Sequence, residues 1–566
     1  MNDQKNFFIA IALSIAVLFA FQYFMPSAPQ KVEPQSTPQS TQQPIVPQVV
    51  APQPLTRAEA LKAAPHRLPL QSSSVKGSIN LEGALFDDLT LVKYHETVNP
   101  KSPEIVLLSP QNAPHAYTAH FGWAGAQGLL PNEKTLWQTN GLKLTPQTPV
   151  TLTWDNGQGL LFHQLISLDE HYMFTITQKV TNTGTTPVSL VPQGFLARQG
   201  EPITSGFFIL HEGPVGVFDG KLNDPGYDDL SKTGTLENPK ATGWFGLTDK
   251  YWLGALVPDP KAVITSSYAR QGTGESTLIS ANYKRDPLAL EPGKSIEVTD
   301  HFFAGAKVLN LLDGYEETLG INHFDLAVDF GWFYFLTKPI FYALEFLKGI
   351  LGNFGLAILA LTVLIKLIFF PLANKSYESM ARMKSLQPEI EKVRERYADD
   401  RVKMNEKVME LYKKEKVNPL AGCLPMVIQI PVFFALYKVL FVSIEMRHAP
   451  FYGWIHDLSA PDPTTIFNLF GLIPWTPPSF LMIGAWPIIM GITMFLQQKL
   501  SPPPADPVQA KLFLFMPFFF TYLLSQFPAG LVIYWAWNNT LSIAQQWLIM
   551  KRSERKRAKH VKREAI

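Results

Sequence analysis

One charged side chain lies inside an otherwise apolar stretch of the chain. Lys366 is the only charged residue between 352 and 372, and Pro371 follows it by five positions. An ammonium group is costly in hydrocarbon, so a cation within a membrane usually marks a functional site. A lysine near a helix end can instead extend its ammonium group to the lipid–water interface. Lys366 therefore either attracts acidic groups in a polar site or snorkels to the interface.

Polar side chains also occur in the other apolar stretches. Trp535, Asn538, Ser542 and Gln545 recur at steps of three, four and three, which places them on one helical face. Other polar residues of these stretches include Thr362, Gln429, Gln497, Gln498, Thr521 and Ser525. Each of them alone fits an interhelical hydrogen bond. Together with Lys366 they predict a shared hydrated surface.

Composition limits the other kinds of chemistry. Of the 566 residues, 46% are hydrophobic and 17% charged, below the roughly 25% charge of ordinary soluble proteins, which indicates contact with lipid. A net charge of +2 argues against a general nucleic-acid binder, so we expect no DNA partner. The single cysteine, Cys423, excludes an intramolecular disulfide and a cysteine-rich zinc site. Neither a phosphate-binding loop nor an H-E-x-x-H pair occurs. We therefore expect no cofactor, no metal and no enzymatic reaction.

The chain begins with a predicted anchor and tether. Residues 7–24 form an apolar run about long enough to cross a bilayer, and the MPSAPQ that follows is a poor cleavage site. Residues 1–25 are therefore predicted to form an uncleaved signal-anchor helix, in preference to a removed signal peptide. Residues 26–54 are rich in Pro, Gln, Ser and Thr, which cannot bury a core, and are predicted to form a linker.

Residues 55–322 carry the pattern of an all-β domain. Segments of period-two alternation are separated by turn signals such as Asp155-Asn156-Gly157 and Asn182-Thr183-Gly184. The clearest strand is expected at 172–180, and a weaker one at 206–211. The pattern predicts a large β-sandwich.

Helices associated with a membrane are predicted after residue 322. Residues 323–349 mix aromatic and charged side chains, which favours an amphipathic helix at the lipid–water interface. Four apolar stretches follow within 350–550, and the last is long enough for two spans separated by the turn at 526–530. The charged segment 374–418 is predicted to form a helical hairpin that turns at 398–400. The expected fold is a polytopic α-helical membrane protein with six transmembrane helices, a five-helix core and a large all-β periplasmic sandwich domain.

Positive charge predicts the side that each loop faces, because short cytoplasmic loops are rich in Lys and Arg. Residues 373–418 contain 12 Lys or Arg and the tail 551–566 contains 8, whereas Arg447 is the only one in 444–479. The chain is therefore predicted to be a multi-pass protein of the bacterial inner membrane with both termini in the cytoplasm. The basic tail could bind anionic lipids or ribosomal RNA, and a plain topology anchor would explain it equally well.

Two segments resemble a known family. The run from Asn418 to Tyr437 (NPLAGCLPMVIQIPVFFALY) and the run FPAGLVIYWAWNNTLSIAQQWLI at 527–549 resemble the YidC membrane protein insertases. The resemblance extends over the whole chain, including the anchor, linker, β domain, interfacial helix, five-helix core, charged hairpin and basic tail. It is closest to the forms of Gram-negative bacteria that carry a large periplasmic domain.

The resemblance implies a function and a site. Members of the family insert and help to fold nascent inner-membrane proteins through a hydrophilic groove, alone or with the Sec translocon, and they act with the ribosome. The groove charge of the family is usually arginine, and Lys366 occupies the corresponding place; lysine keeps the charge but lacks the bidentate guanidinium. Thr362, Gln429 and Trp535 match positions in or beside the groove. The predicted substrate-binding groove therefore comprises Lys366, Thr362, Gln429, Trp535, Asn538 and Ser542.

Two other functions remain as alternatives. A secondary transporter would contain paired broken helices or an internal repeat, and the sequence has no detectable repeat. A periplasmic carbohydrate-binding protein would place its function in residues 55–322, because the β domain resembles a supersandwich related to sugar-binding folds. That likeness by itself implies no activity.

Overall fold

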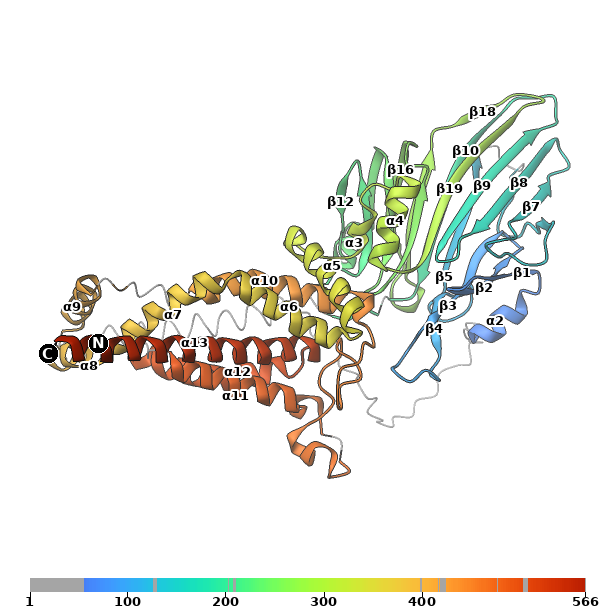
Figure 1. The fold of residues 1–566 in the computed structure, drawn as a ribbon. Coiled ribbons are helices and arrows are strands. Elements are labelled where there is room, and N and C mark those ends of the chain that lie inside the picture. Colours follow the sequence, from blue (N-terminus) through green and yellow to red (C-terminus); the bar gives the residue numbers. More distant parts are fainter. Residues whose placement is uncertain are drawn as a thin grey trace, which may run out of the picture. The chain divides into compact units, whose positions relative to one another are not determined.

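The chain folds into two compact units, and their elements are labelled in Figure 1. The computed structural model describes residues 55–125, 130–201, 203–206, 210–397, 400–415, 417, 424–475, 477–501 and 507–564. The predicted anchor at 1–25 and linker at 26–54 lie outside the described residues. The first unit comprises the chain up to Glu96 together with Pro103–Ala327, and the second comprises Thr97–Ser102 and the chain from Val328 onward.

Two large antiparallel sheets form the first unit, which confirms the predicted β-sandwich. One sheet comprises β1 (Arg67–Gln71), β2 (Val75–Asn80), β3 (Leu85–His95), β4 (Glu104–Leu108), β5 (Tyr117–Gly125), β10 (Val188–Gln199), β13 (Thr235–Ala241), β16 (Ile264–Gln271), β17 (Leu278–Arg285) and β18 (Leu288–Leu290). The other comprises β6 (Gln138–Thr139), β7 (Val150–Asp155), β8 (Leu160–Leu168), β9 (Met173–Asn182), β11 (Gly213–Phe218), β12 (Lys221–Asn223), β14 (Gly243–Thr248), β15 (Trp252–Pro258) and β19 (Ser295–Ala306). Short helices accompany the sheets: α2 (Arg57–Ala63), α3 (Tyr227–Thr233) and α4 (Leu309–Leu319).

An aromatic cluster fills the space between the two sheets. Phe86 and Phe121 come from β3 and β5, whereas Phe174 and Phe302 come from β9 and β19 of the opposite sheet. All four side chains are fully buried, and the ring centroids of Phe86 and Phe174 lie 5.3 Å apart in an edge-to-face arrangement. Edge-to-face pairs add roughly 0.5–1.5 kcal/mol beyond the burial of their area. The core of this unit is therefore built from residues of both sheets.

The strand predicted at 172–180 forms β9, and its burial alternates along most of its length. It ends at the predicted turn, where the side chain of Asn182 accepts a hydrogen bond from the backbone N–H of Gly184 at 2.9 Å. Asp155 accepts one from Gly157 at 2.8 Å in the same way, and Gly157 has a φ of 67°, which favours glycine. The weaker strand expected at 206–211 is not formed at residues 206, 210 and 211, and residues 207–209 lie outside the described part.

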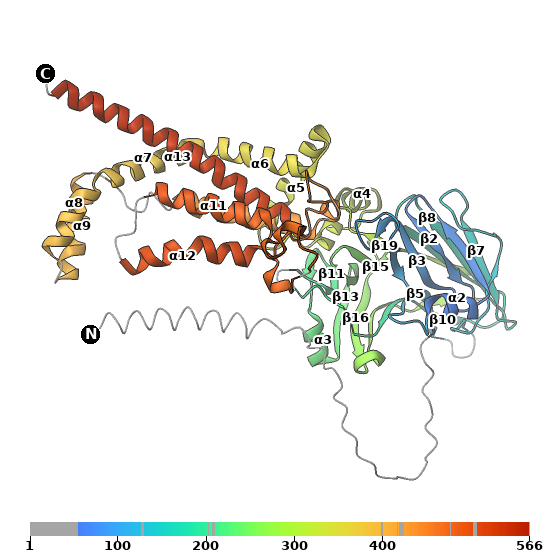
Figure 2. The ribbon, with the colours of Figure 1, turned by 90° about the horizontal axis from the view of Figure 1, so that it is seen from below.

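Helices make up most of the second unit. Their bounds are α5 (Tyr334–Leu351), α6 (Phe354–Ile368), α7 (Phe370–Ser385), α8 (Gln387–Arg396), α9 (Arg401–Lys414), α10 (Leu424–Val442), α11 (Ala485–Leu500), α12 (Pro507–Leu524) and α13 (Ala529–Glu564). The helix α13 is 36 residues long and contacts α6, α7, α10 and α11. Figure 2 shows it running the length of the helical unit. The polar face predicted around Ser542 is therefore placed against several partners at once.

The segment predicted as two charged helices contains three. The first part of 374–418 belongs to α7, which begins at Phe370 and ends at Ser385, and α8 and α9 follow it. A new helix starts at Gln387 because Pro388 suits the first turn, where its missing N–H is not needed. Leu386, Ile390, Val408 and Val417 form the apolar contact of this region. The helix pair around the expected turn thus consists of α8 and α9.

The described helices do not confirm the predicted number of membrane crossings. No single helix among them combines the length and hydropathy of a membrane span. Helices α5 and α6 meet that requirement only as a pair, bent by 120° at their junction. Shorter apolar helices occur at Gln429–Val442 and Ala510–Leu524.

A buried ion pair joins the two sheets of the first unit. Arg285 at the end of β17 donates a hydrogen bond to the carboxylate of Asp300 in β19 and another to the backbone oxygen of Thr299, at 3.0 Å. The side chain of Asp300 is fully buried, and burial raises the pKa of its carboxyl group although Arg285 lowers it. The charge of Asp300 is therefore tolerated because Arg285 accompanies it.

We expect Arg285→Met to destabilise the first unit by about 3–5 kcal/mol, because it leaves a buried charge without compensation. Without Arg285 the pKa of Asp300 rises further above its unfolded value, so protonation relieves the strain. The loss of stability should be largest at neutral pH and smaller at acidic pH. Thermal unfolding of the full chain, followed by the circular dichroism of its strands, measures the difference. Lys76→Met is the control, since its ion pair with Glu104 is exposed; equal losses in both variants would contradict the prediction.

Candidate functional site

Lys366 lies in the last turn of α6 and reaches toward α13. Its Nζ donates a hydrogen bond to the hydroxyl oxygen of Ser542 at 2.7 Å. Ser542 is buried, and its own hydroxyl donates to the backbone oxygen of Asn538 at 2.8 Å. The side chain of Tyr377 in α7 lines the same pocket as Lys366. Ser542 is therefore the point at which α6 and α13 are joined by a polar contact.

The hydrogen-bond partner of Lys366 in this arrangement carries no charge. Serine is a neutral acceptor, so it solvates the cation without cancelling it. In the part of the chain that the structure describes, no Asp or Glu forms an ion pair with Lys366. An external carboxylate would therefore meet an uncompensated positive charge.

A small pocket opens at Lys366. Its lining residues come from α6, α7 and α10, and they are Ile365, Lys366, Phe369, Leu372, Ala373, Tyr377 and Gln429. We call this space the Lys366 pocket. Most of its wall is apolar, and its polar side chains are those of Lys366, Tyr377 and Gln429.

Two further polar pairs lie near the pocket on the same helices. The side-chain amide of Gln429 donates a hydrogen bond to the hydroxyl of Tyr534, which joins α10 to α13. Gln545 donates to the side-chain oxygen of Asn374 at 3.1 Å, which joins α13 to α7. These hydrogen bonds hold α7 and α10 against α13 beside Lys366.

The other predicted groove residues make their contacts outside this pocket. Thr362 is 1% exposed, and its hydroxyl donates to the backbone oxygen of Ile358 in its own helix. Trp535 packs against Phe433, with ring centroids 4.6 Å apart. Asn538 is buried, and its Oδ1 has no hydrogen-bond partner among the described residues. Of the six predicted groove residues, Lys366 and Gln429 line the pocket, and Ser542 contacts Lys366 through its hydrogen bond.

The polar residues of α11 and α12 serve local contacts. Thr521 and Ser525 donate to the backbone oxygens of Pro517 and Tyr522, one turn earlier in the chain. Gln498 donates to the backbone oxygen of Phe513, which joins α11 to α12. Gln498 thus makes the interhelical bond that a single polar residue suggests, whereas Thr521 and Ser525 bond the backbone of their own segment.

Sequence reasoning missed two tyrosines of the site. Tyr534 lies four residues before Asn538 and eight before Ser542, so the helical period could have placed it on the same face. Tyr377 follows the charged Lys375 and had been assigned to the cytoplasmic hairpin, so no pattern pointed to it. It reaches the site because α7 begins directly after α6, at Phe370.

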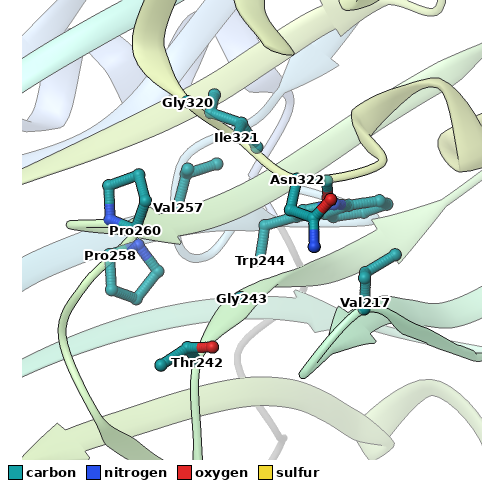
Figure 3. Close-up of a pocket in the computed structure, with 11 residues that line it drawn as sticks. Val217, Thr242, Gly243, Trp244, Val257, Pro258, Pro260, Gly320, Ile321 and Asn322 are labelled. Carbon is teal, nitrogen blue, oxygen red and sulfur yellow. The ribbon is translucent and has the colours of Figure 1, made fainter.

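A second pocket, of about 100 Å³, lies in the β-sandwich unit (Figure 3). Its lining residues are Val217, Gly220, Thr242, Gly243, Trp244, Val257, Pro258, Pro260, Gly320, Ile321 and Asn322. The indole N–H of Trp244 is already bonded to the backbone oxygen of Asn322, at 3.2 Å. None of these lining residues is titratable, so the pocket offers no acid, base or charge. The Lys366 pocket is therefore the better candidate for chemistry.

Comparison with known proteins assigns the family. The model of the YidC periplasmic domain matches residues 67–343, and that of the 60Kd inner membrane protein matches residues 346–557. A membrane protein insertase YidC from Methylobacterium nodulans is 50% identical, and the match covers 98% of this chain and 96% of that protein. The chain belongs to the YidC family of membrane protein insertases. Like the rest of the YidC family, it is an inner membrane protein.

A second relative agrees with this family. A membrane protein insertase YidC from Methylorubrum extorquens is 49% identical, over 98% of this chain and 96% of that protein. A solved structure described as an active YidC insertase with the first transmembrane domain resolved is 17% identical. It covers 85% of this chain and 92% of its own, with a TM-score of 0.35.

The Lys366 pocket predicts different accessibility at two positions of one helix. In a chain with Cys423→Ser, a charged thiol reagent should modify Lys366→Cys several-fold faster than Thr362→Cys, because Lys366 lines the pocket and Thr362 is buried. The rates are measured on the full chain in vesicles, with the reagent on both faces. If both cysteines are equally protected from the reagent, water does not enter the helical bundle at Lys366. That result would contradict the prediction.

Proposed function

We propose that this insertase receives a polar segment of a nascent inner-membrane protein in the Lys366 pocket while the client's apolar helix passes sideways into lipid. The observation that carries the proposal is the hydrogen bond between Lys366 and Ser542, which holds an uncompensated cation among apolar helices. The pocket would attract acidic groups of the client. No covalent reaction is part of this mechanism.

The energetics of the proposal need no nucleotide. A charged side chain at the centre of a membrane-inserted helix costs about 2.5–3.5 kcal/mol on insertion scales. A polar pocket that reaches partway across the bilayer shortens the distance over which this cost applies. Burial of the client's apolar helix returns roughly 25 cal/mol per Å². The insertase then lowers a barrier, and the client's own hydrophobicity drives the reaction.

The proposed topology has six crossings. Both termini and the segment 374–418 lie in the cytoplasm, and the β-sandwich lies in the periplasm, as the distribution of Lys and Arg favours. We further propose that the ribosome, the Sec translocon and anionic lipids are partners, with the basic tail 551–566 at the cytoplasmic surface. A nascent chain leaving the ribosome would then meet the Lys366 pocket from the cytoplasmic side.

The two alternative functions have less support. A secondary transporter needs paired broken helices around its substrate, and the chain has no detectable internal repeat. Carbohydrate binding requires several convergent hydrogen-bonding groups, whereas Thr242 and Asn322 are the only residues with polar amide or hydroxyl side chains in the lining of the β-sandwich pocket. Neither alternative explains the polar contacts around Lys366.

Charge substitutions at Lys366 test the mechanism. We expect Lys366→Arg to preserve insertion, Lys366→Ala to reduce it, and Lys366→Glu to reduce it most, because a carboxylate repels an acidic client segment. The measurement is the fraction of a client protected in vesicles that contain the purified chain. The client carries a short translocated segment with two aspartates.

The matched control is the same client with both aspartates replaced by asparagine. Its insertion should depend several-fold less on the charge at position 366, since the attraction is absent. If all three variants insert the acidic client equally well, Lys366 has no role beyond snorkelling.

A further inference from the structure

The loop between α10 and α11 exposes an unusual number of apolar side chains. Its second half contains the short 3-10 helices η5 (Ile466–Gly471) and η6 (Ser479–Leu481) and appears as the orange segment before α11 in Figure 1. Leu472 is 83% exposed, Phe480 59%, and Trp475 48%. Isolated apolar residues on a surface are ordinary, but a contiguous group of this kind marks an interaction site.

The same segment carries no charge. Asp462 is the last charged residue before it, and the next is Lys499, well inside α11. A loop in water normally contains charged residues. Their absence between Asp462 and Lys499 favours an environment of hydrocarbon.

Backbone polar groups of the loop are bonded within the loop. The side chain of Asn468 accepts from the N–H of Gly471 at 2.9 Å and donates to the backbone oxygen of Trp475 at 3.3 Å. The N–H of Phe470 is bonded to Thr465 and that of Ile473 to Asn468, both through backbone oxygens. A segment that leaves water must satisfy its own backbone in this way, because lipid offers no partners.

The turn itself displays its apolar side chains. Leu469 and Phe470 have φ angles of 49° and 57°, a left-handed conformation that bulky residues rarely adopt. Both side chains remain more than half exposed. The strained turn therefore presents these two side chains on the surface of the protein and does not bury them.

A buried carboxylate holds the base of the loop. Asp462 accepts hydrogen bonds from the indole of Trp454, from Thr464 and from the backbone N–H of Trp486 in the first turn of α11. Thr465 donates to the backbone oxygen of Leu481 at 2.9 Å, which closes the loop at its other end. The exposed residues are thus carried on a fixed frame at the end of α11.

We propose that residues 465–475 and 477–483 enter the acyl layer of the membrane leaflet at which α10 ends and α11 begins. The inference rests on the proposed topology, in which both helices cross the membrane. The ligand is lipid hydrocarbon, recognised by apolar side chains on a loop that carries no charge and bonds several of its backbone N–H groups internally. The loop anchors this end of α11 in lipid.

Depth-dependent quenching tests the proposal. The full chain with Cys423→Ser and Leu472→Cys is labelled with an environment-sensitive fluorophore and placed in phosphatidylcholine vesicles. Val402→Cys in α9, where the native side chain is 81% exposed, is the matched control in a charged hairpin. Lipids with a spin label on the acyl chain should quench the label at 472 several-fold more than at 402, and aqueous iodide should show the reverse order. Phe480→Cys provides a second position should the first variant fold poorly.

Two results would overturn the proposal. Iodide quenching at 472 and 480 equal to that at 402 would place the loop in water. Protection from both quenchers would indicate contact with protein, such as a second copy of the chain. Insertion of the acidic client is measured in the same vesicles, so a failure of the loop proposal is distinguished from a failure of the Lys366 pocket.

Discussion

An ammonium group among apolar helices needs an acceptor, and the organisation of the helical unit follows from how Lys366 obtains one. The acceptor is the hydroxyl of Ser542, which lies on a different helix and is itself bonded back to Asn538. A carboxylate in this place would have neutralised the cation, whereas a hydroxyl leaves its charge available. Helices α6, α7, α10 and α13 must meet closely for this contact and for the bond between Gln429 and Tyr534.

Patterns formed by residues close together in the sequence predicted much of the fold. The alternation of buried and exposed residues in β9 and the Asx turn at Asn182 depend on neighbouring residues alone. Both could therefore be recognised without knowledge of the fold. Lys366 stood out for the same reason, because a single charge in an apolar run is visible locally. The boundary between α7 and α8 was missed, although Pro388 marks it.

Contacts between distant segments could not be derived in the same way. Thr362 lies one turn from Lys366 but bonds its own helix, while Gln429 reaches the pocket from another helix. Which polar residues share a space depends on helix rotation and packing, and those depend on side chains far apart in the sequence. Tyr377 entered the site because α7 begins directly after α6, a continuity that the charged composition of the segment concealed.

The length of α13 couples the pocket to the end of the chain. Its 36 residues extend for about 54 Å at 1.5 Å per residue, while the hydrocarbon core of a bilayer is about 30 Å thick. No proline interrupts it between Ser542 and the cluster of basic residues after residue 550. An unbroken helix moves as a rigid body. A force applied to its basic end therefore tilts or rotates Ser542, which accepts the hydrogen bond of Lys366.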